Sequence, residues 1–316
     1  MKITILDGYA ANPGDVSWDA IKALGDVTVY ERTSADKVVQ RIADSDGILL
    51  NKVQITRDIV AQCPNLKYIG VLATGYNVVD TAACRKKGIV VTNIPSYSTD
   101  AVAQHVFAFI LAFANRVAEH SASVHNGDWI TNPDFCYWLS PLTELAGKTL
   151  GIFGFGNIGQ KVAKIAHTLG MNVIVHVHSE KSFTGGEKTV STEELFRQAD
   201  FLTLHAPMTN ETANLINEQT LSLMKPTAIL INTARGGLVD EQAVRSALDR
   251  KKIAGYAADV ILNEPMNADC PLCGAPNCLL TPHIAWAPKE TRERLLSIAT
   301  ENLRAFLAGK PQNVVN

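Results

Sequence analysis

Short apolar runs alternate with polar, helix-prone segments along most of the chain. In the first round of this alternation the apolar runs are residues 3–6, 27–30, 47–50, 67–72 and 89–92. In the second round they are residues 148–156, 172–177, 200–207, 228–232, 253–260 and 277–282. Strands that alternate with helices favour parallel sheets with helices on both faces. The pattern therefore predicts an α/β fold with two doubly wound parallel sheets.

A long apolar segment, residues 101–124, separates the two rounds and is predicted to be one helix capped by Asp100. The irregular, aromatic-rich stretch 126–144 that follows is typical of an arm that packs on something else. A final helix, predicted over 289–308, is expected to return to the first sheet. The predicted domains are 1–98 plus 287–316, the substrate domain, and 99–286, the dinucleotide-binding domain with the helix and the arm.

Composition narrows the class of protein. The 316 residues carry a net charge of −2, which gives no indication of a nucleic-acid partner or an anionic membrane surface. No apolar run reaches the roughly 18 residues of a membrane span. The first residues enter a strand and lack the apolar core of a signal peptide. We expect a cytoplasmic protein without nucleic-acid or membrane partners.

Half of the six cysteines lie close together in one segment. Cys270, Cys273 and Cys278 have a Cys-x2-Cys-x4-Cys spacing, and His283 follows five residues after the last of them, a pattern that a metal site could use. A structural zinc site usually needs two well-spaced pairs of ligands, however. If His283 acts in catalysis, it cannot also be a closed-site ligand. We therefore expect no metal, and interpret the segment as a loop that is rich in cysteine.

A glycine-rich motif follows the first strand of the second round. Its sequence is GFGNIG over residues 154–159, with an apolar strand before it and a plausible helix after it. In this context the glycines permit a tight turn and close backbone approach to a pyrophosphate at the helix N-terminus. The predicted cofactor-binding residues here are Gly154, Gly156, Asn157, Ile158 and Gly159.

The choice between NAD and NADP depends on a position about 20 residues further along. NAD-binding loops commonly carry Asp or Glu there, but this chain has Val177. Residues His178, Ser179 and Lys181 could accommodate a 2′-phosphate instead. Alternatively, Glu180 could reach the ribose, or NAD could bind without this contact. The sequence thus predicts NAD or NADP and leaves the preference open.

Three chemically distinct side chains follow later apolar runs. Arg235, Glu264 and His283 are all expected near strand ends, where open α/β sheets bind ligands. Reduction of a 2-keto acid needs a cation for the carboxylate and a general acid for the carbonyl oxygen. Arg235 suits the first role and His283 the second. Glu264 would orient the imidazole and stabilise its protonated form. We predict these three residues to be catalytic.

The chain resembles the D-isomer-specific 2-hydroxyacid dehydrogenase family over nearly its whole length. The matching stretches are VLATGYNVVD (71–80), NIPSYSTDAVAQHVFAFIL (93–111), LAGKTLGIFGFGNIGQ (145–160), LHAPMT (204–209), INTARGGLVDE (231–241) and TPHIAW (281–286). The resemblance implies a flavodoxin-like substrate domain and a Rossmann dinucleotide-binding domain. It also implies that Arg235 binds substrate, that Glu264 is the partner of His283, and that His283 is the acid/base.

Further roles follow from the resemblance alone. Backbone amides of Ala73, Thr74 and Gly75 are implied to cradle the substrate carboxylate, as a backbone anion nest would. Asp259 is implied to meet the nicotinamide carboxamide. Residues implied to line the cofactor cleft are His205, Pro207 and Thr233. Members of the family are usually dimers through the long helix, so a homodimer is expected.

Within the family, residues 6–25 and 133–148 look most like glycerate dehydrogenases, also called hydroxypyruvate reductases. Trp138 resembles an aromatic residue that some of them insert into a neighbouring subunit's active site. The expected substrate is a small 2-keto acid, hydroxypyruvate or glyoxylate. Lys52 is the main candidate for an additional substrate-binding cation, and Arg57 is the next. The absence of a basic cluster makes a phosphorylated substrate less favoured.

Other interpretations stay open at this point. A same-class dehydrogenase could act on lactate or phosphoglycerate, and formate oxidation is a weaker possibility because formate has less need of Glu264. A protein of another class would sense NADH without turnover, as in the family's corepressor branch, because function depends on the site and not on the fold. The Arg235, Glu264 and His283 set favours the enzyme.

Overall fold

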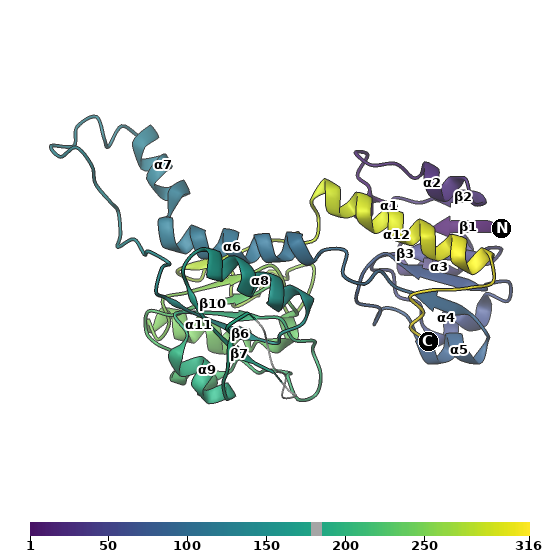
Figure 1. The fold of residues 1–316 in the computed structure, drawn as a ribbon. Helices are drawn as coiled ribbons and strands as arrows, with labels where there is room; N and C mark the ends of the chain where they lie inside the picture. Colours follow the sequence, from purple (N-terminus) through teal and green to yellow (C-terminus); the bar gives the residue numbers. More distant parts are fainter. Residues whose placement is uncertain (178–184) are drawn as a thin grey trace. The chain divides into compact units, whose positions relative to one another are not determined.

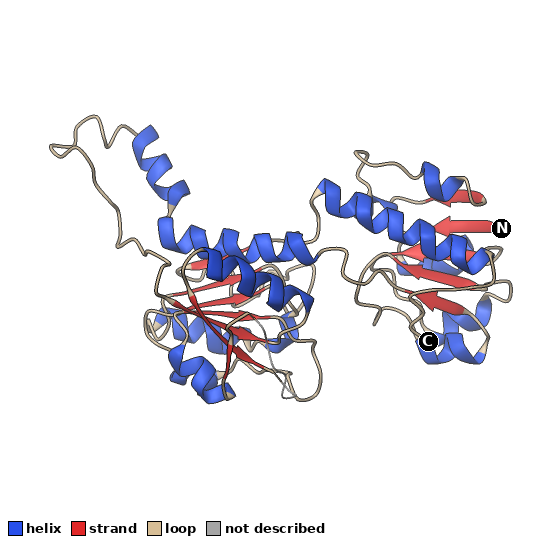
Figure 2. Ribbon diagram, viewed as in Figure 1, coloured by secondary structure: helices blue, strands red, loops and turns tan. Residues whose placement is uncertain are grey.

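The computed structural model describes residues 1–177 and 185–316, and the chain forms two compact units. Unit 1 consists of Met1–Ser98 and Trp286–Asn316, and unit 2 of Thr99–Ala285. Unit 2 is thus inserted into the sequence of unit 1. Figure 1 traces the order of the elements along the chain, and Figure 2 shows that each unit has a sheet with helices on its faces.

Unit 1 contains a parallel five-stranded sheet of order β2-β1-β3-β4-β5. The strands are β1 (Lys2–Ile5), β2 (Asp26–Val29), β3 (Gly47–Leu50), β4 (Tyr68–Val71) and β5 (Val90–Thr92). The helices are α1 (Gly8–Ala11), α2 (Asp19–Lys22), the 3₁₀ turn η1 (Ala35–Lys37), α3 (Val38–Ile42), α4 (Arg57–Gln62), α5 (Thr81–Lys86) and α12 (Lys289–Leu307). Every residue of β3 and β4 is buried, as expected of central strands covered on both faces.

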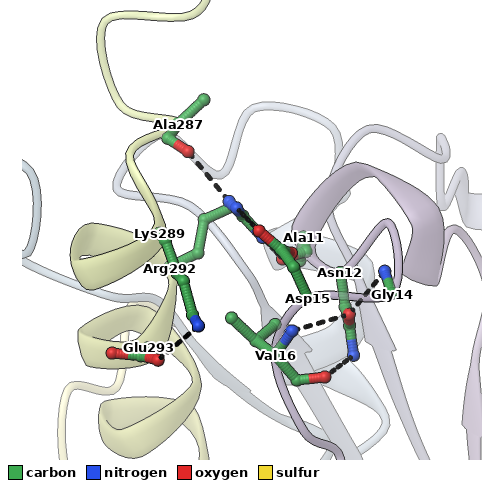
Figure 3. Close-up of polar contacts among 9 residues, drawn as sticks. All are labelled: Ala11, Asn12, Gly14, Asp15, Val16, Ala287, Lys289, Arg292 and Glu293. Carbon is green, nitrogen blue, oxygen red and sulfur yellow. Dashed lines mark hydrogen bonds and ion pairs between the residues drawn. The ribbon is translucent and has the colours of Figure 1, made fainter.

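Helix α12 belongs to unit 1 although it comes last in the chain. Its side chains Leu295 and Leu303 are buried in one cluster with Ile3 and Tyr68 of the sheet. Arg292 of the same helix is 7% exposed. Figure 3 shows its guanidinium against the Asp15 carboxylate, with N–O distances of 2.6 Å at both oxygens. Apolar packing and this ion pair together fix α12 on the sheet.

Unit 2 contains a parallel seven-stranded sheet of order β12-β11-β10-β9-β6-β7-β8. The strands are β6 (Thr149–Phe153), β7 (Asn172–His176), β8 (Lys188–Thr189), β9 (Phe201–Leu204), β10 (Ile229–Asn232), β11 (Gly255–Ala258) and β12 (Cys278–Leu280). The helices are α6 (Thr99–Asn115), α7 (Val117–His125), α8 (Asn157–Thr168), α9 (Thr192–Gln198), α10 (Glu218–Leu223), the 3₁₀ turn η2 (Gly236–Leu238) and α11 (Glu241–Asp249). The prediction of two doubly wound parallel α/β units is confirmed.

The single helix predicted over 101–124 is wrong. Arg116 adopts a left-handed backbone conformation with φ of 47°, which ends α6 and starts α7 in a new direction. The two helices differ in direction by 52°. Asp100 lies in the first turn of α6 and not at its cap, because the helix already begins at Thr99.

The described helices were compared with the length and composition of a membrane span. Among the described helices, none is by itself both long and apolar enough to cross a bilayer. The bent pair α6 and α7 passes the test of length and composition only when the two are taken together.

Candidate active site

The glycine motif forms the turn between β6 and α8. Gly154 has φ of +90°, and a Cβ there would lie 2.8 Å from the backbone of His205 and Ala206. A Cβ on Gly159 would lie 2.5 Å from the carbonyl oxygen of Gly154. Both positions therefore require glycine. Gly156 differs, since a Cβ there would meet nothing within 4 Å and would only fill open space in front of α8.

This turn has the properties of an anion site. Gly156 caps α8 without a side-chain hydrogen bond, and the first turn of α8 has no acidic residue. Asn157 is exposed and Ile158 packs against the core beneath the helix. The positive end of the helix dipole and its first N–H groups favour a phosphate at such a terminus. The residues predicted from the motif are thus together, and they fit a dinucleotide.

Thr233 gives independent support for a bound group at this sheet edge. It follows β10, and its hydroxyl oxygen is buried without a hydrogen-bond partner within the described chain. A buried polar atom without a partner costs free energy, so its persistence indicates a ligand that is not part of the chain. NAD or NADP would supply the partner where the resemblance placed one.

His205 and Pro207 follow β9 at the same edge. The backbone N–H of His205 donates to the carbonyl of Phe153 at 2.8 Å, and Nε2 lies 3.0 Å from the Thr203 hydroxyl. Burial lowers the pKa of His205 to about 3, so the ring stays neutral and cannot serve as a cation for phosphate. Pro207 is exposed, and its carbonyl accepts from Thr212 at 2.7 Å.

The predicted ribose contacts His178, Ser179 and Lys181 lie outside the described residues. The strand before them, β7, ends at His176, whose ring stacks on Phe153 at 5.0 Å. Val177 is partly buried against the core of unit 2.

Glu264 and His283 come together after β11 and β12. Nδ1 of His283 lies 2.6 Å from Oε2 of Glu264, and both side chains are about 30% exposed, at 28% and 31%. The second oxygen of Glu264 accepts from the backbone N–H of Ile261 at 3.3 Å. A carboxylate at Nδ1 fixes the tautomer, because it requires a proton there. The other ring nitrogen, Nε2, is then the atom that can exchange a proton with a substrate.

Asp259 holds the loop that carries His283. The Asp259 side chain is 1% exposed, and one oxygen accepts from the Thr281 hydroxyl at 2.6 Å and from the Ile284 N–H at 2.7 Å. Its other oxygen accepts from the Ala285 N–H at 2.8 Å. Both oxygens are therefore engaged within the chain, a task that sequence reasoning missed. The sequence does place Asp259 at the end of β11 and Thr281-Pro282-His283 at the end of the neighbouring strand β12. Two adjacent strand ends of this kind could have indicated a contact between Asp259 and the His283 loop.

Arg235 lies in extended backbone after β10, with an exposed side chain. Its backbone carbonyl accepts from the Asn232 amide at 2.8 Å, and one guanidinium nitrogen donates to the Ala234 carbonyl at 2.6 Å. The remaining guanidinium N–H groups keep the planar fork that matches a carboxylate.

In unit 1, the predicted carboxylate cradle follows β4. The carbonyls of Ala73 and Thr74 accept from Ile94 and Asn93 at 3.0 and 2.8 Å. Within the described residues, the backbone N–H groups of Ala73, Thr74 and Gly75 form no hydrogen bond. Three consecutive amides of this kind are suited to an anion.

A second loop at the edge of the unit 1 sheet is held by Asp7, which sequence reasoning also missed. The Asp7 carboxylate accepts from the N–H groups of Asn51, Lys52 and Val53 at 2.8, 2.6 and 3.2 Å. The Asn51 amide donates to the Leu72 carbonyl at 2.7 Å and so connects this loop to the end of β4. Lys52 is exposed on the loop. Arg57 pairs with Asp80 at 3.9 Å.

The cysteine segment forms no metal cluster in the part of the chain that the structure describes. All six cysteines are free thiols. Burial raises the pKa of Cys278 to about 12, so its sulfur remains protonated. Trp138, on the arm, is 65% exposed.

Comparison with known proteins gives the family. The profile of the D-isomer specific 2-hydroxyacid dehydrogenase NAD-binding domain matches residues 107–285. The chain belongs to the D-isomer-specific 2-hydroxyacid dehydrogenase family. A hydroxypyruvate reductase of Blautia hydrogenotrophica is 46% identical over all of both chains, and a glycerate dehydrogenase of Methylorubrum extorquens is 42% identical over 90% of each. A solved structure of an acyclic imino acid reductase with NADPH and D-Arg superposes over all of both chains with a TM-score of 0.88 and 33% identity.

Membership confirms several predictions. The protein is a D-2-hydroxyacid dehydrogenase, an oxidoreductase that acts on a small 2-hydroxy or 2-keto acid. Its Rossmann unit binds NAD or NADP, with the preference between them open.

Proposed function

We propose that this dehydrogenase reduces hydroxypyruvate or glyoxylate to D-glycerate or glycolate. The observation that carries the proposal is the 2.6 Å contact between Glu264 and His283, at the sheet edge that also presents Arg235 and the glycine turn. The printed activities of the two relatives, both of which span most of the chain, support the choice of substrate.

The residues have complementary roles in this proposal. Bound NADH or NADPH supplies the hydride that adds to the 2-keto carbon. His283 gives its Nε2 proton to the carbonyl oxygen, on which negative charge grows. The Glu264 carboxylate lies at Nδ1 and stabilises the imidazolium before transfer. The products are the 2-hydroxy acid and the oxidised dinucleotide. In the reverse direction, neutral His283 accepts the hydroxyl proton.

Substrate recognition is assigned to charged and backbone donors. Arg235 binds the carboxylate and the carbonyl oxygen through its fork. In unit 1, the amides of Ala73, Thr74 and Gly75 are assigned to carboxylate binding, and Lys52 is assigned as an additional cation. Thr233, His205, Pro207 and the glycine turn contact the dinucleotide. Asp259 acts through the His283 loop, because both of its oxygens are already engaged there.

A homodimer is part of the same proposal. The arm exposes several large apolar side chains in the described chain, among them Ile130 at 86% and Phe135 at 89%, together with Trp138. Exposed apolar side chains gathered on one segment are expected to pack on another apolar surface. The same segment of a second copy of the chain offers such a surface. Light scattering should give twice the chain mass, and a monomer at micromolar concentration would contradict this part.

We also assign the enzyme to the cytoplasm. Its six free thiols fit a reducing compartment, where cysteines remain unpaired. Fractionation of the cells that make the protein, with the dehydrogenase activity measured in each fraction, tests the assignment.

The substrate proposal is tested by steady-state kinetics. We expect kcat/KM to be highest for hydroxypyruvate or glyoxylate when these are compared with pyruvate and phosphohydroxypyruvate, each with NADH and with NADPH. The two cofactor series also decide the nucleotide preference. Higher kcat/KM for pyruvate or phosphohydroxypyruvate would overturn the substrate choice.

A further inference from the structure

The loop that carries Glu264 has almost no apolar anchor. Residues 262–269 are all exposed, including Leu262 at 58% and Met266 at 48%. A loop without buried side chains is not fixed by packing, so its polar contacts decide its position. The Glu264–His283 contact therefore depends on whatever holds this loop by hydrogen bonds.

Glu241, in the first turn of α11, makes hydrogen bonds that hold this loop. One oxygen of its half-buried carboxylate accepts from the Leu262 N–H at 2.7 Å. The other lies 3.7 Å from the Cys270 sulfur at the far end of the same loop. Burial raises the pKa of Cys270, so the thiol keeps its proton and can donate toward Glu241. One carboxylate thus joins both ends of the loop.

The backbone at Ile261 and Leu262 is also in contact with Gly236. A Cβ there would lie 2.0 Å from the Ile261 carbonyl carbon and oxygen, so the backbone of the Arg235 turn is packed directly against Ile261. The Ile261 N–H in turn donates to Glu264 at 3.3 Å. The segment 235–241 therefore meets the Ile261–Leu262 peptide at both Gly236 and Glu241, and it also carries Arg235.

We propose that Glu241 is a positioning residue for catalysis: by accepting the Leu262 N–H it fixes the exposed loop so that Glu264 meets His283. The inference rests on the proposed roles of Glu264 and His283. It gives Glu241 no contact with substrate or dinucleotide.

Three substitutions test the acceptor role. Glu241→Ala removes the acceptor, and Glu241→Asp withdraws it by one methylene while keeping the charge and a good residue for a first helical turn. Glu241→Gln keeps an oxygen that can accept the Leu262 N–H. The matched control is Glu218→Ala, because Glu218 also lies in a helix first turn, in α10, and is exposed. The Glu218→Ala variant measures the effect of losing a favourable charge at a helix N-terminus, without any effect on the Glu264 loop.

The measurements are hydroxypyruvate kinetics between pH 5 and 9 and amide hydrogen exchange of residues 261–264. We expect Glu241→Ala and Glu241→Asp to lower kcat by about 10- to 100-fold. Their pH midpoint for reduction should move to lower pH, because Glu264 stabilises the imidazolium less well. KM for the dinucleotide should not change, and exchange at 261–264 should accelerate. Glu241→Gln and Glu218→Ala should stay within about twofold of wild type.

The failure of this proposal differs from that of the proposed function. The proposed role of Glu241 would be wrong if Glu241→Asp had the kcat, pH midpoint and amide exchange of the wild type. This holds whether or not the Glu241→Ala variant loses activity. Loss of activity in Glu218→Ala equal to that in Glu241→Ala would do the same. If the wild-type protein reduces no 2-keto acid, the proposed function is wrong. In that case the amide hydrogen exchange of residues 261–264 alone tests whether Glu241 holds the loop.

Discussion

The proposed acid/base chemistry of this enzyme depends on one side-chain contact, between Glu264 and His283. His283 adopts φ of 55°, a left-handed backbone conformation that a non-glycine residue seldom takes. The Asp259 bonds to Ile284 and Ala285 hold the loop immediately after it. The conformation that aims the imidazole at Glu264 is thus maintained by a buried carboxylate and not by the histidine itself.

Replacement of the imidazole should separate chemistry from binding. We expect His283→Asn to lower kcat for reduction by about 10²–10⁴-fold, the usual range for loss of a general acid. The dissociation constant for NADH, measured by fluorescence, should change little, because the glycine turn is intact. In wild type, kcat/KM for reduction should fall as pH rises and that for oxidation should rise, since the two directions need opposite protonation states. Full activity in the variant would contradict the assignment.

Asp7 should affect substrate affinity without touching the dinucleotide. Asp7→Asn leaves one acceptor oxygen for three N–H groups, so the loop with Lys52 should loosen. We expect KM for the 2-keto acid to rise by about tenfold, with KM for NADH unchanged. Asp19→Asn, an exposed aspartate of α2, is the matched control. Equal KM values in both variants would argue against a role for Asp7.

At the scale of elements, apolar runs predicted the strands well because central strands of a parallel sheet are buried on both faces. The turn at Gly154 was predicted because glycines at this spacing after a strand have one plausible task. Glu264 and His283 were predicted together because a carboxylate and an imidazole near strand ends complement each other. The sequence gives Asp259 only the cofactor role implied by the family resemblance. The loop-holding roles of Asp259 and Asp7 could not be predicted, because a carboxylate can bind a ligand or hold backbone N–H groups, and only the fold decides between the two. The break at Arg116 was missed because apolar periodicity continues through it.

The contacts of Asp200 with Lys225 and Thr149 in unit 2 should make the free energy of unfolding depend on pH in the acid range. Burial would raise the pKa of Asp200, but the Lys225 ammonium and the Thr149 N–H, each at 2.8 Å, lower it overall. A lowered folded pKa adds stability above the unfolded carboxyl pKa of about 3.9, and this contribution is lost as pH falls through the folded value. We expect Asp200→Asn to reduce the free energy of unfolding by about 1–2 kcal/mol at pH 7.

Urea unfolding of Asp200→Asn and wild type between pH 7 and pH 3 measures this effect. The difference between the two should narrow toward pH 3. A difference that stays constant over this range would show that the charge of Asp200 is not its cause.

At the scale of the whole molecule, the chain enters unit 2 after residue 98 and re-enters unit 1 at residue 286. The ion pair in Figure 3 lies just beyond this second crossing. Arg292 also donates to the Ala287 carbonyl at 2.8 Å, so it fixes the first residues of the returning chain as well as α12.

Replacing Asp15 and replacing Arg292 should lower the melting temperature by different amounts. The Asp15 side chain is 45% exposed and that of Arg292 is 9% exposed. Asp15→Asn leaves a buried cation without its counter-ion, whereas Arg292→Met leaves a carboxylate that water can solvate. We expect Asp15→Asn to lower the melting temperature more than Arg292→Met. The Arg292 hydrogen bond lowers the pKa of Asp15, so the wild-type advantage should vanish in strong acid. The reverse order of melting temperatures would contradict this account.

The insertion of unit 2 also sets the order in which the protein can mature during synthesis. Chains leave the ribosome amino end first, at about 5–20 residues per second. All strands of unit 2 are therefore made before α12. Until residues 289–307 emerge, the sheet face that includes Ile3 and Tyr68 lacks its cover of Leu295 and Leu303. The nascent chain thus carries a completed nucleotide-binding unit while one face of the unit 1 sheet is still uncovered, and that face is the surface that chaperones would have to protect.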